Sequence, residues 1–140
     1  MLQLSKVILS FLVLSFPLIT SAKDLQNNVP AKCPNVAVVQ AEGLDVVYDE
    51  FFDRYYGKKV SKYDTNDDWG FGIGYFQASS LDEAKQKVQD GLMMISGNPE
   101  PANYRGNGWF CVYETGTDRI AVAGFVDKNS NQPSILQLLK

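Results

Sequence analysis

Two tyrosines and two lysines in the middle of the chain are the residues best suited to ligand chemistry. The four residues are Tyr55, Tyr56, Lys58 and Lys59. The sequence contains 0 histidines, so tyrosine is the main haem-ligating side chain left, besides the weaker Met93 and Met94. A phenolate next to cations that pair with propionates would form a hemin site. The alternative is that the aromatic side chains only pack in a core or sheet.

The same composition excludes several classes of protein. Without histidine, the chain has no Ser-His-Asp or Cys-His catalytic centre, no HExxH zinc site and no histidine-ligated haem. Its 2 cysteines are too few for an all-cysteine zinc site. A net charge of -3 and a pI near 4.8 argue against a nucleic-acid partner. We therefore expect a protein that is not an enzyme, without a metal centre.

Three further motifs resemble functional sites without matching them. The glycines of the segment 70–74 (GFGIG) lack the spacing of a dinucleotide-binding turn and are expected in a strand. The segment 64–68 (DTNDD) begins like a calcium loop, but Trp69 and Tyr75 occupy the positions that need Gly and Glu. Three acidic residues are interpreted as the polar side of an amphipathic element rather than a catalytic pair: Asp49, Glu50 and Asp53.

Residues 1–22 have the pattern of a secretory signal peptide. Lys6 supplies a positive charge, Val7 to Ile19 is a short apolar segment, and small residues precede a cleavage site after Ala22. An uncleaved membrane anchor is the alternative, but the apolar segment is short for a membrane span. We expect a secreted or periplasmic protein with no membrane span after cleavage.

Export gives the two cysteines a structural role. Oxidising compartments allow Cys33 and Cys111 to pair. A disulfide around so long a loop stabilises by about 4 kcal/mol in the chain-entropy model. A free reactive thiol is the alternative, but neither a CxxC motif nor a histidine is present to lower a thiol pKa.

The pattern of apolar residues predicts one long helix among several strands. Ser80 and Glu83 form a capping box, and an apolar stripe follows until Gly97. Gly91 within this helix is expected to mark a close packing contact. Predicted strands cover 36–40, 58–63, 69–78, 109–115 and 120–126, with 58–63 as an edge strand and a loop over 97–108. Residues 44–56 have helical spacing but strand-forming composition, so periodicity alone leaves them open.

These elements predict an α+β fold in which an antiparallel sheet carries one long helix on one face, stapled by the disulfide. In 69–75, alternation places Trp69, Phe71, Ile73 and Tyr75 on one face and the three glycines on the other. We expect the helix to lie on the glycine side. The predicted organisation is a signal peptide at 1–22, a flexible leader at 23–32, one domain at 33–127 and a C-terminal tail at 128–140.

Several short motifs together resemble a family of small exported bacterial proteins with a domain of unknown function, some of whose members are named hemin-binding proteins. The motifs are the signal peptide, Cys33-Pro34-Asn35-Val36, Tyr63-Asp64-Thr65 with Trp69-Gly70-Phe71, Ser79-Ser80, and Trp109-Phe110-Cys111-Val112-Tyr113. The resemblance covers roughly Cys33 to Val126 and supplies no axial ligand. It implies hemin binding in iron acquisition and favours strands over residues 44–63.

The leading hypothesis is an exported, non-enzymatic binding protein with hemin as ligand and partner, contacted by Tyr55, Tyr56, Lys58 and Lys59. No other cofactor is expected. The alternative is a secreted module that binds or inhibits another protein through its aromatic surface or the 97–108 loop. A hydrolase that uses carboxylates alone is the weakest of the three hypotheses.

Overall fold

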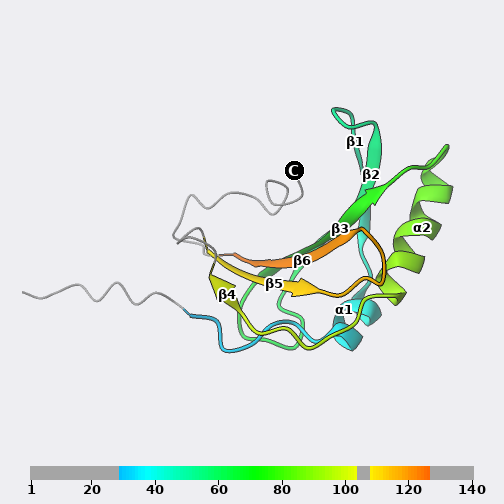
Figure 1. Cartoon of the computed structure of the whole chain (residues 1–140). Coiled ribbons are helices and arrows are strands. Elements are labelled where there is room, and N and C mark those ends of the chain that lie inside the picture. The colour runs from blue at the N-terminus through cyan, green and yellow to red at the C-terminus, as the bar shows by residue number, and fades with distance from the viewer. Residues whose placement is uncertain (1–28, 104–107, 127–140) are drawn as a thin grey trace, which may run out of the picture.

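The computed structural model describes residues 29–103 and 108–126. Its elements are α1 (Val36–Glu42), β1 (Asp45–Asp49), β2 (Arg54–Ser61), β3 (Trp69–Phe76), α2 (Leu81–Met93), β4 (Ala102–Asn103), β5 (Trp109–Tyr113) and β6 (Ile120–Phe125). The strands form one antiparallel sheet in the order β1-β2-β3-β6-β5-β4. In Figure 1, α2 runs along the sheet and α1 lies near the last turn of α2. The predicted α+β class is confirmed, with a second, short helix added.

Strand β3 lies at the centre of the sheet and supplies the largest side chains of the core. Trp69, Phe71 and Ile73 are fully buried, and the cluster around them includes Val88 and Leu92 of α2. We call this side of the sheet the helix face. The opposite side, which carries Gly70, Gly72 and Gly74, is called the glycine face.

Helix α2 packs on the helix face, so the prediction that it lies over the three glycines of β3 is wrong. Gly57 of β2 pairs with Ile73, and a Cβ on Gly57 would lie 2.6 Å from Val88 Cγ1. A Cβ on Gly91 would lie 2.8 Å from Cζ of Phe76, which confirms that Gly91 marks a close contact. The helix therefore approaches the bulky side of β3, and glycines on the neighbouring strand and on the helix itself provide the space.

The alternation of β3 changes at its end. The Gly74–Tyr75 peptide is cis, and the register with β2 shifts between Tyr55 and Tyr56. With this register shift, Phe76 faces α2, whereas Tyr75 packs against Tyr56 on the glycine face. The prediction that Tyr75 shares a face with Trp69, Phe71 and Ile73 is thus wrong, because a bulge turns the following side chains to the opposite face.

The start of α2 agrees with the predicted cap. Ser80 Oγ accepts from Glu83 N at 3.2 Å. The Glu83 carboxylate accepts from both N and Oγ of Ser79, rather than from the Ser80 amide, and pairs with Lys87 at 2.7 Å. The helix ends earlier than predicted, at Met93 instead of the turn before Gly97. The reason is that Ser96 leaves the helix to bridge Glu114.

Residues 36–40 form a helix, which corrects the predicted strand. Asn35 caps α1 by accepting from Ala37 N, and Gly43, with φ of 70°, ends it. The valines favour strands in isolation, but helical spacing directs Val36 and Val39 to the same core. Gln40 then donates to the carbonyls of Leu92, Met93 and Ile95, so α1 satisfies free acceptors at the end of α2.

Residues 44–56 form strand, turn and strand, as the family resemblance implied, rather than the helix that their spacing favoured. Strands β1 and β2 make a hairpin whose tip extends past the rest of the sheet (Figure 1). The expected edge strand at 58–63 is also wrong, because β2 lies between β1 and β3. The edges are β1 and β4, the latter a short strand within the predicted 97–108 loop.

The predicted disulfide between Cys33 and Cys111 is present and spans 78 positions. It joins the segment before α1, rather than an N-terminal strand, to β5. Beside it, the buried Tyr113 hydroxyl donates to the Pro34 carbonyl at 2.7 Å. The structure describes the leader ahead of Cys33 only from residue 29 onward. Within this part, Lys32 pairs with Asp64. Neither helix of the described ranges is long and apolar enough to span a membrane.

We expect Gly57→Ala to destabilise the fold by about 1–3 kcal/mol, because the new methyl group overlaps Val88 and Leu44. Urea unfolding of the oxidised protein measures this loss. The neighbouring exposed substitution Lys58→Ala is the matched control. Gly57→Ala combined with Val88→Ala should cost less than the sum of the two single changes. An unchanged midpoint for Gly57→Ala would contradict the close approach.

Glu83 should make stability depend on pH. Hydrogen bonds from Lys87 and then Ser79 lower the pKa of Glu83 from 4.5 to about 2. A lowered pKa in the folded state stabilises above the unfolded pKa, and this contribution is lost as the pH falls from about 4.5 towards 2. Glu83→Gln should therefore lower the melting temperature at pH 7 and flatten its fall towards pH 2. Asp82→Asn, at an exposed site on the same turn, should do neither.

Candidate functional site

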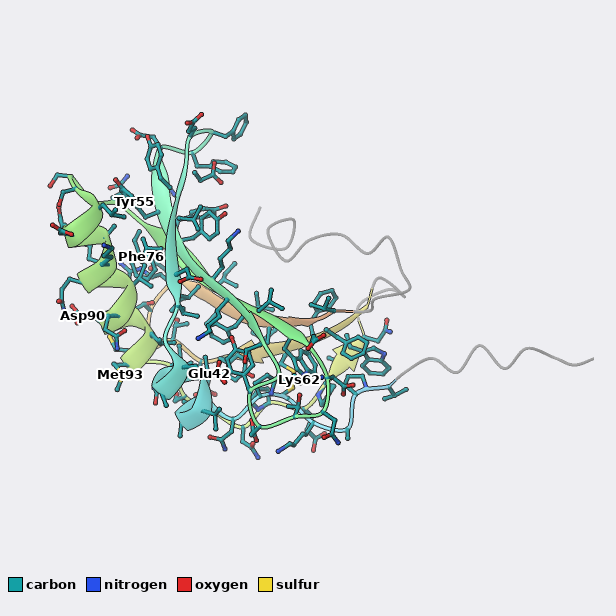
Figure 2. The ribbon with its side chains drawn as sticks, turned by 180° about the vertical axis from the view of Figure 1, so that it is seen from behind. Glu42, Tyr55, Lys62, Phe76, Asp90 and Met93 are labelled. Atoms are coloured by element: carbon teal, nitrogen blue, oxygen red, sulfur yellow. A yellow bond between two sulfur atoms is a disulfide. The ribbon has the colours of Figure 1, made fainter. Side chains whose placement is uncertain are left out.

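The four candidate ligand residues do not converge on one surface. Successive residues of a strand point to opposite faces, and β2 carries all four. Tyr56 and Lys58 pair with Gly74 and Gly72 and share the glycine face. Tyr55 packs against Tyr48 on the helix face, where Figure 2 shows it on the same side of the sheet as Phe76. Lys59 also points to the helix face and pairs with Glu42 at 3.5 Å.

Tyr56 belongs to an aromatic cluster that its own sequence neighbourhood does not reveal. The ring centroids of Tyr56 and Tyr75 lie 5.8 Å apart in an edge-to-face arrangement. The ring centroid of Tyr75 lies 5.6 Å from that of Phe52. The Tyr75 hydroxyl donates to Asp49 at 3.3 Å. Tyr75 and Asp49 were not among the predicted ligand residues, because the bulge that turns Tyr75 towards Tyr56 has no signature in the sequence.

The environment of this cluster raises the pKa of its phenols. Burial, followed by the charge of Asp49, raises the pKa of Tyr56 and of Tyr75. A hydrogen bond to Asp49 raises the pKa of Tyr75 further. Tyrosine is already protonated at neutral pH, so a metal that binds one of these side chains must displace its proton, and the raised pKa makes that displacement more costly.

The glycine face has no side chains at the three glycines of β3, and apolar residues lie at its border. Gly72 lies between Lys58 of β2 and Val122 of β6, and both Gly72 and Val122 are buried. At the border of the face, Val60 is 66% exposed and Val112 is 67% exposed. Both helices of the described chain lie away from this face, since α2 packs on the opposite side. Lys58 is exposed and makes no ion pair within residues 29–103 and 108–126.

The other acidic motifs have structural partners. Asp49 caps the β1–β2 turn by accepting from Phe51 N and Phe52 N, and Asp53 accepts from the Tyr48 hydroxyl. In the 64–68 segment, Asp64 accepts from Asn35 N and Lys32 Nζ. Burial opposes ionisation of Asp64, but these hydrogen bonds prevail and its pKa is lowered. These contacts indicate that Asp49, Asp53 and Asp64 stabilise turns of the fold.

The fold and this surface define a small α+β domain with a covalently tethered N-terminal segment and a glycine-lined sheet face. The chain belongs to the family defined by a domain of unknown function (DUF4949), which matches residues 32–140. The match includes residues 128–140, which lie outside the described ranges and were predicted to form a separate tail. No curated protein and no solved structure matched the chain. The family description assigns no activity.

We expect Asp49→Asn to lower the pKa of Tyr75, and to a lesser extent that of Tyr56, because it removes a nearby negative charge. Tyrosine-labelled NMR spectra recorded from neutral to alkaline pH would measure both values. Glu50→Gln, a neighbouring change in the same turn, is the charge-matched control. If Tyr75 titrates at the same pH in wild type and Asp49→Asn, its hydroxyl does not contact Asp49.

Proposed function

We propose that this protein is an exported, non-enzymatic binding protein and that hemin is its ligand. Hemin enters the proposal through the family resemblance of the sequence motifs. The observation that carries the site is the glycine row of β3, a flat stretch of buried backbone next to the buried Tyr56 and the exposed Lys58. Glycine in a strand permits a ligand or another backbone to approach closely.

Export is supported by the N-terminal signal pattern and by the Cys33–Cys111 disulfide, a bond typical of oxidising compartments. A binding role, rather than catalysis, is supported by the acidic residues of the hairpin. Asp49 and Asp53 hold the hairpin turn through hydrogen bonds. Their carboxylates therefore have a structural role that does not require a substrate.

Hemin on the glycine face would lie against β3 with its propionates near Lys58. Its iron would take Tyr56 as a ligand after the phenol loses its proton. Because burial and Asp49 raise the pKa of Tyr56, this ligation costs free energy at neutral pH. Hemin affinity is therefore expected to rise with pH, since proton release accompanies binding.

A hemin titration of protein isolated after export would test the proposal, with the Soret absorbance as readout. We expect saturable binding, weakened about tenfold by Tyr56→Phe and several-fold by Lys58→Gln. The matched controls are Tyr55→Phe and Lys59→Gln on the opposite face, which should leave affinity within about twofold of wild type.

The outcomes separate the ligand from its site. No saturable Soret change in the wild-type protein would reject hemin and favour the alternative, an interaction module. Among the large hydrophobic side chains of residues 29–103 and 108–126, the most exposed is Phe51 at the hairpin tip, at 86%. Binding that weakens equally in the Tyr55 and Tyr56 variants would instead reject the glycine face.

A further inference from the structure

A polar pocket lies where the end of β3 meets the β5–β6 turn and the first turns of α2. Its volume is about 450 Å³. The side chains around it come from distant parts of the chain: Arg54, Tyr75, Gln77, Lys87, Asp118 and Arg119. Three of these are cations and one is an acid. None of the three cations was predicted as a site residue, because only the fold brings β2, α2 and the β5–β6 turn together.

Arg119 is held firmly at this pocket. Its guanidinium lies 4.6 Å from the centre of the Phe76 ring, and Phe76 is itself 1% exposed beneath Gly91. The backbone of Arg119 is fixed by two threonines, since Arg119 N donates to Thr117 Oγ1 and Arg119 O accepts from Thr115 Oγ1. The packing of the planar guanidinium on the ring limits how it can turn.

The buried polar atom of the Arg119 side chain has no partner. Its Nε is buried and makes no hydrogen bond within the described part of the chain. A buried N–H group without an acceptor is costly, and such groups are rare in folded proteins. The Nε and a neighbouring Nη of arginine form a two-donor fork that matches two oxygens of a carboxylate or phosphate.

The charges around the pocket leave a surplus of cations. Lys87 is neutralised by Glu83 and also donates to the Gln77 carbonyl at 2.8 Å. Arg54 and Arg119 make no ion pair with any described residue. Asp118 is the one carboxylate among the lining residues. Two unpaired guanidinium groups thus face a single acid.

We propose that this pocket binds a small oxyanion, a carboxylate or phosphate group, with the Arg119 fork as its principal ligand and Arg54 as a second cation. Such an anion would balance the surplus positive charge, and it would accept from the unpaired Nε once the guanidinium turns this buried atom towards the pocket. Lys87, already bound to Glu83, would contribute less. The proposal does not depend on hemin, because the group recognised is an oxyanion without a porphyrin.

Titration of the oxidised full-length protein with inorganic phosphate, and separately with succinate, tests this site at constant ionic strength. The readout is the Nε–H signal of each arginine in ¹H–¹⁵N NMR spectra. We expect saturable shifts of the Arg119 signal with at least one probe. The probe that binds more tightly distinguishes a phosphate ligand from a carboxylate.

Three variants make the result decisive. Arg119→Lys keeps the charge but loses the fork, and should weaken binding about tenfold. Arg54→Gln, at an exposed strand end, should weaken it several-fold without affecting folding. Lys85→Gln removes an equal charge from the exposed side of α2 and should leave affinity unchanged. Shifts that do not saturate, or equal losses in Arg54→Gln and Lys85→Gln, would overturn the proposal.

Discussion

The close packing of α2 on the sheet governs where the other elements and surfaces of this domain can lie. Gly57 on β2 and Gly91 on α2 leave no room for a Cβ where Val88 and Phe76 approach. Packing at this distance buries Ile73, Phe76 and Leu92 together, and burial of such apolar surface is the main favourable contribution to folding. A glycine in the middle of a helix costs about 0.5–1 kcal/mol relative to alanine, a cost that this close packing offsets.

This contact also determines which surfaces remain for ligands. Once α2 occupies the bulky side of β3, the glycine face is the side that neither described helix covers. Tyr56 and Lys58 therefore lie together on that face, apart from Tyr55 and Lys59. The same contact holds Phe76 in place beneath the guanidinium of Arg119. The two proposed binding regions thus depend on one packing arrangement, although different residues form them.

Three contacts hold the N-terminal segment to the rest of the domain. The disulfide joins Cys33 to β5, Tyr113 donates to the Pro34 carbonyl, and Asp64 accepts from the Asn35 amide. These contacts position the start of α1. Gln40 of α1 can then donate to the last carbonyls of α2. Covalent and hydrogen-bonded links therefore hold the segment before α1, and Gln40 links α1 to the end of α2.

Local patterns in the sequence were sufficient for the features that depend on neighbouring residues. The Ser80 cap, the strands around 69–76 and 109–125, and the pairing of the two cysteines follow from short-range chemistry or from composition. Helical spacing was misleading at 44–56, where aromatic side chains on both faces of a hairpin imitate an amphipathic stripe. At 36–40 the sequence favoured a strand, and the helix was not predicted. This valine-rich segment becomes helical because Asn35 caps it and Val39 enters the core.

Residue types and local spacing were sufficient to predict a disulfide-linked α+β domain without histidine chemistry, because both are properties of short stretches of chain. The folded arrangement was needed to show which face of the sheet α2 covers, that Tyr55 and Tyr56 lie on opposite faces, and that Tyr75 packs against Tyr56. It alone also brought Arg54, Lys87 and Arg119 to one pocket. The physical reason is that strand register and helix docking depend on contacts between distant residues, and a bulge at one position changes which face the next side chain occupies.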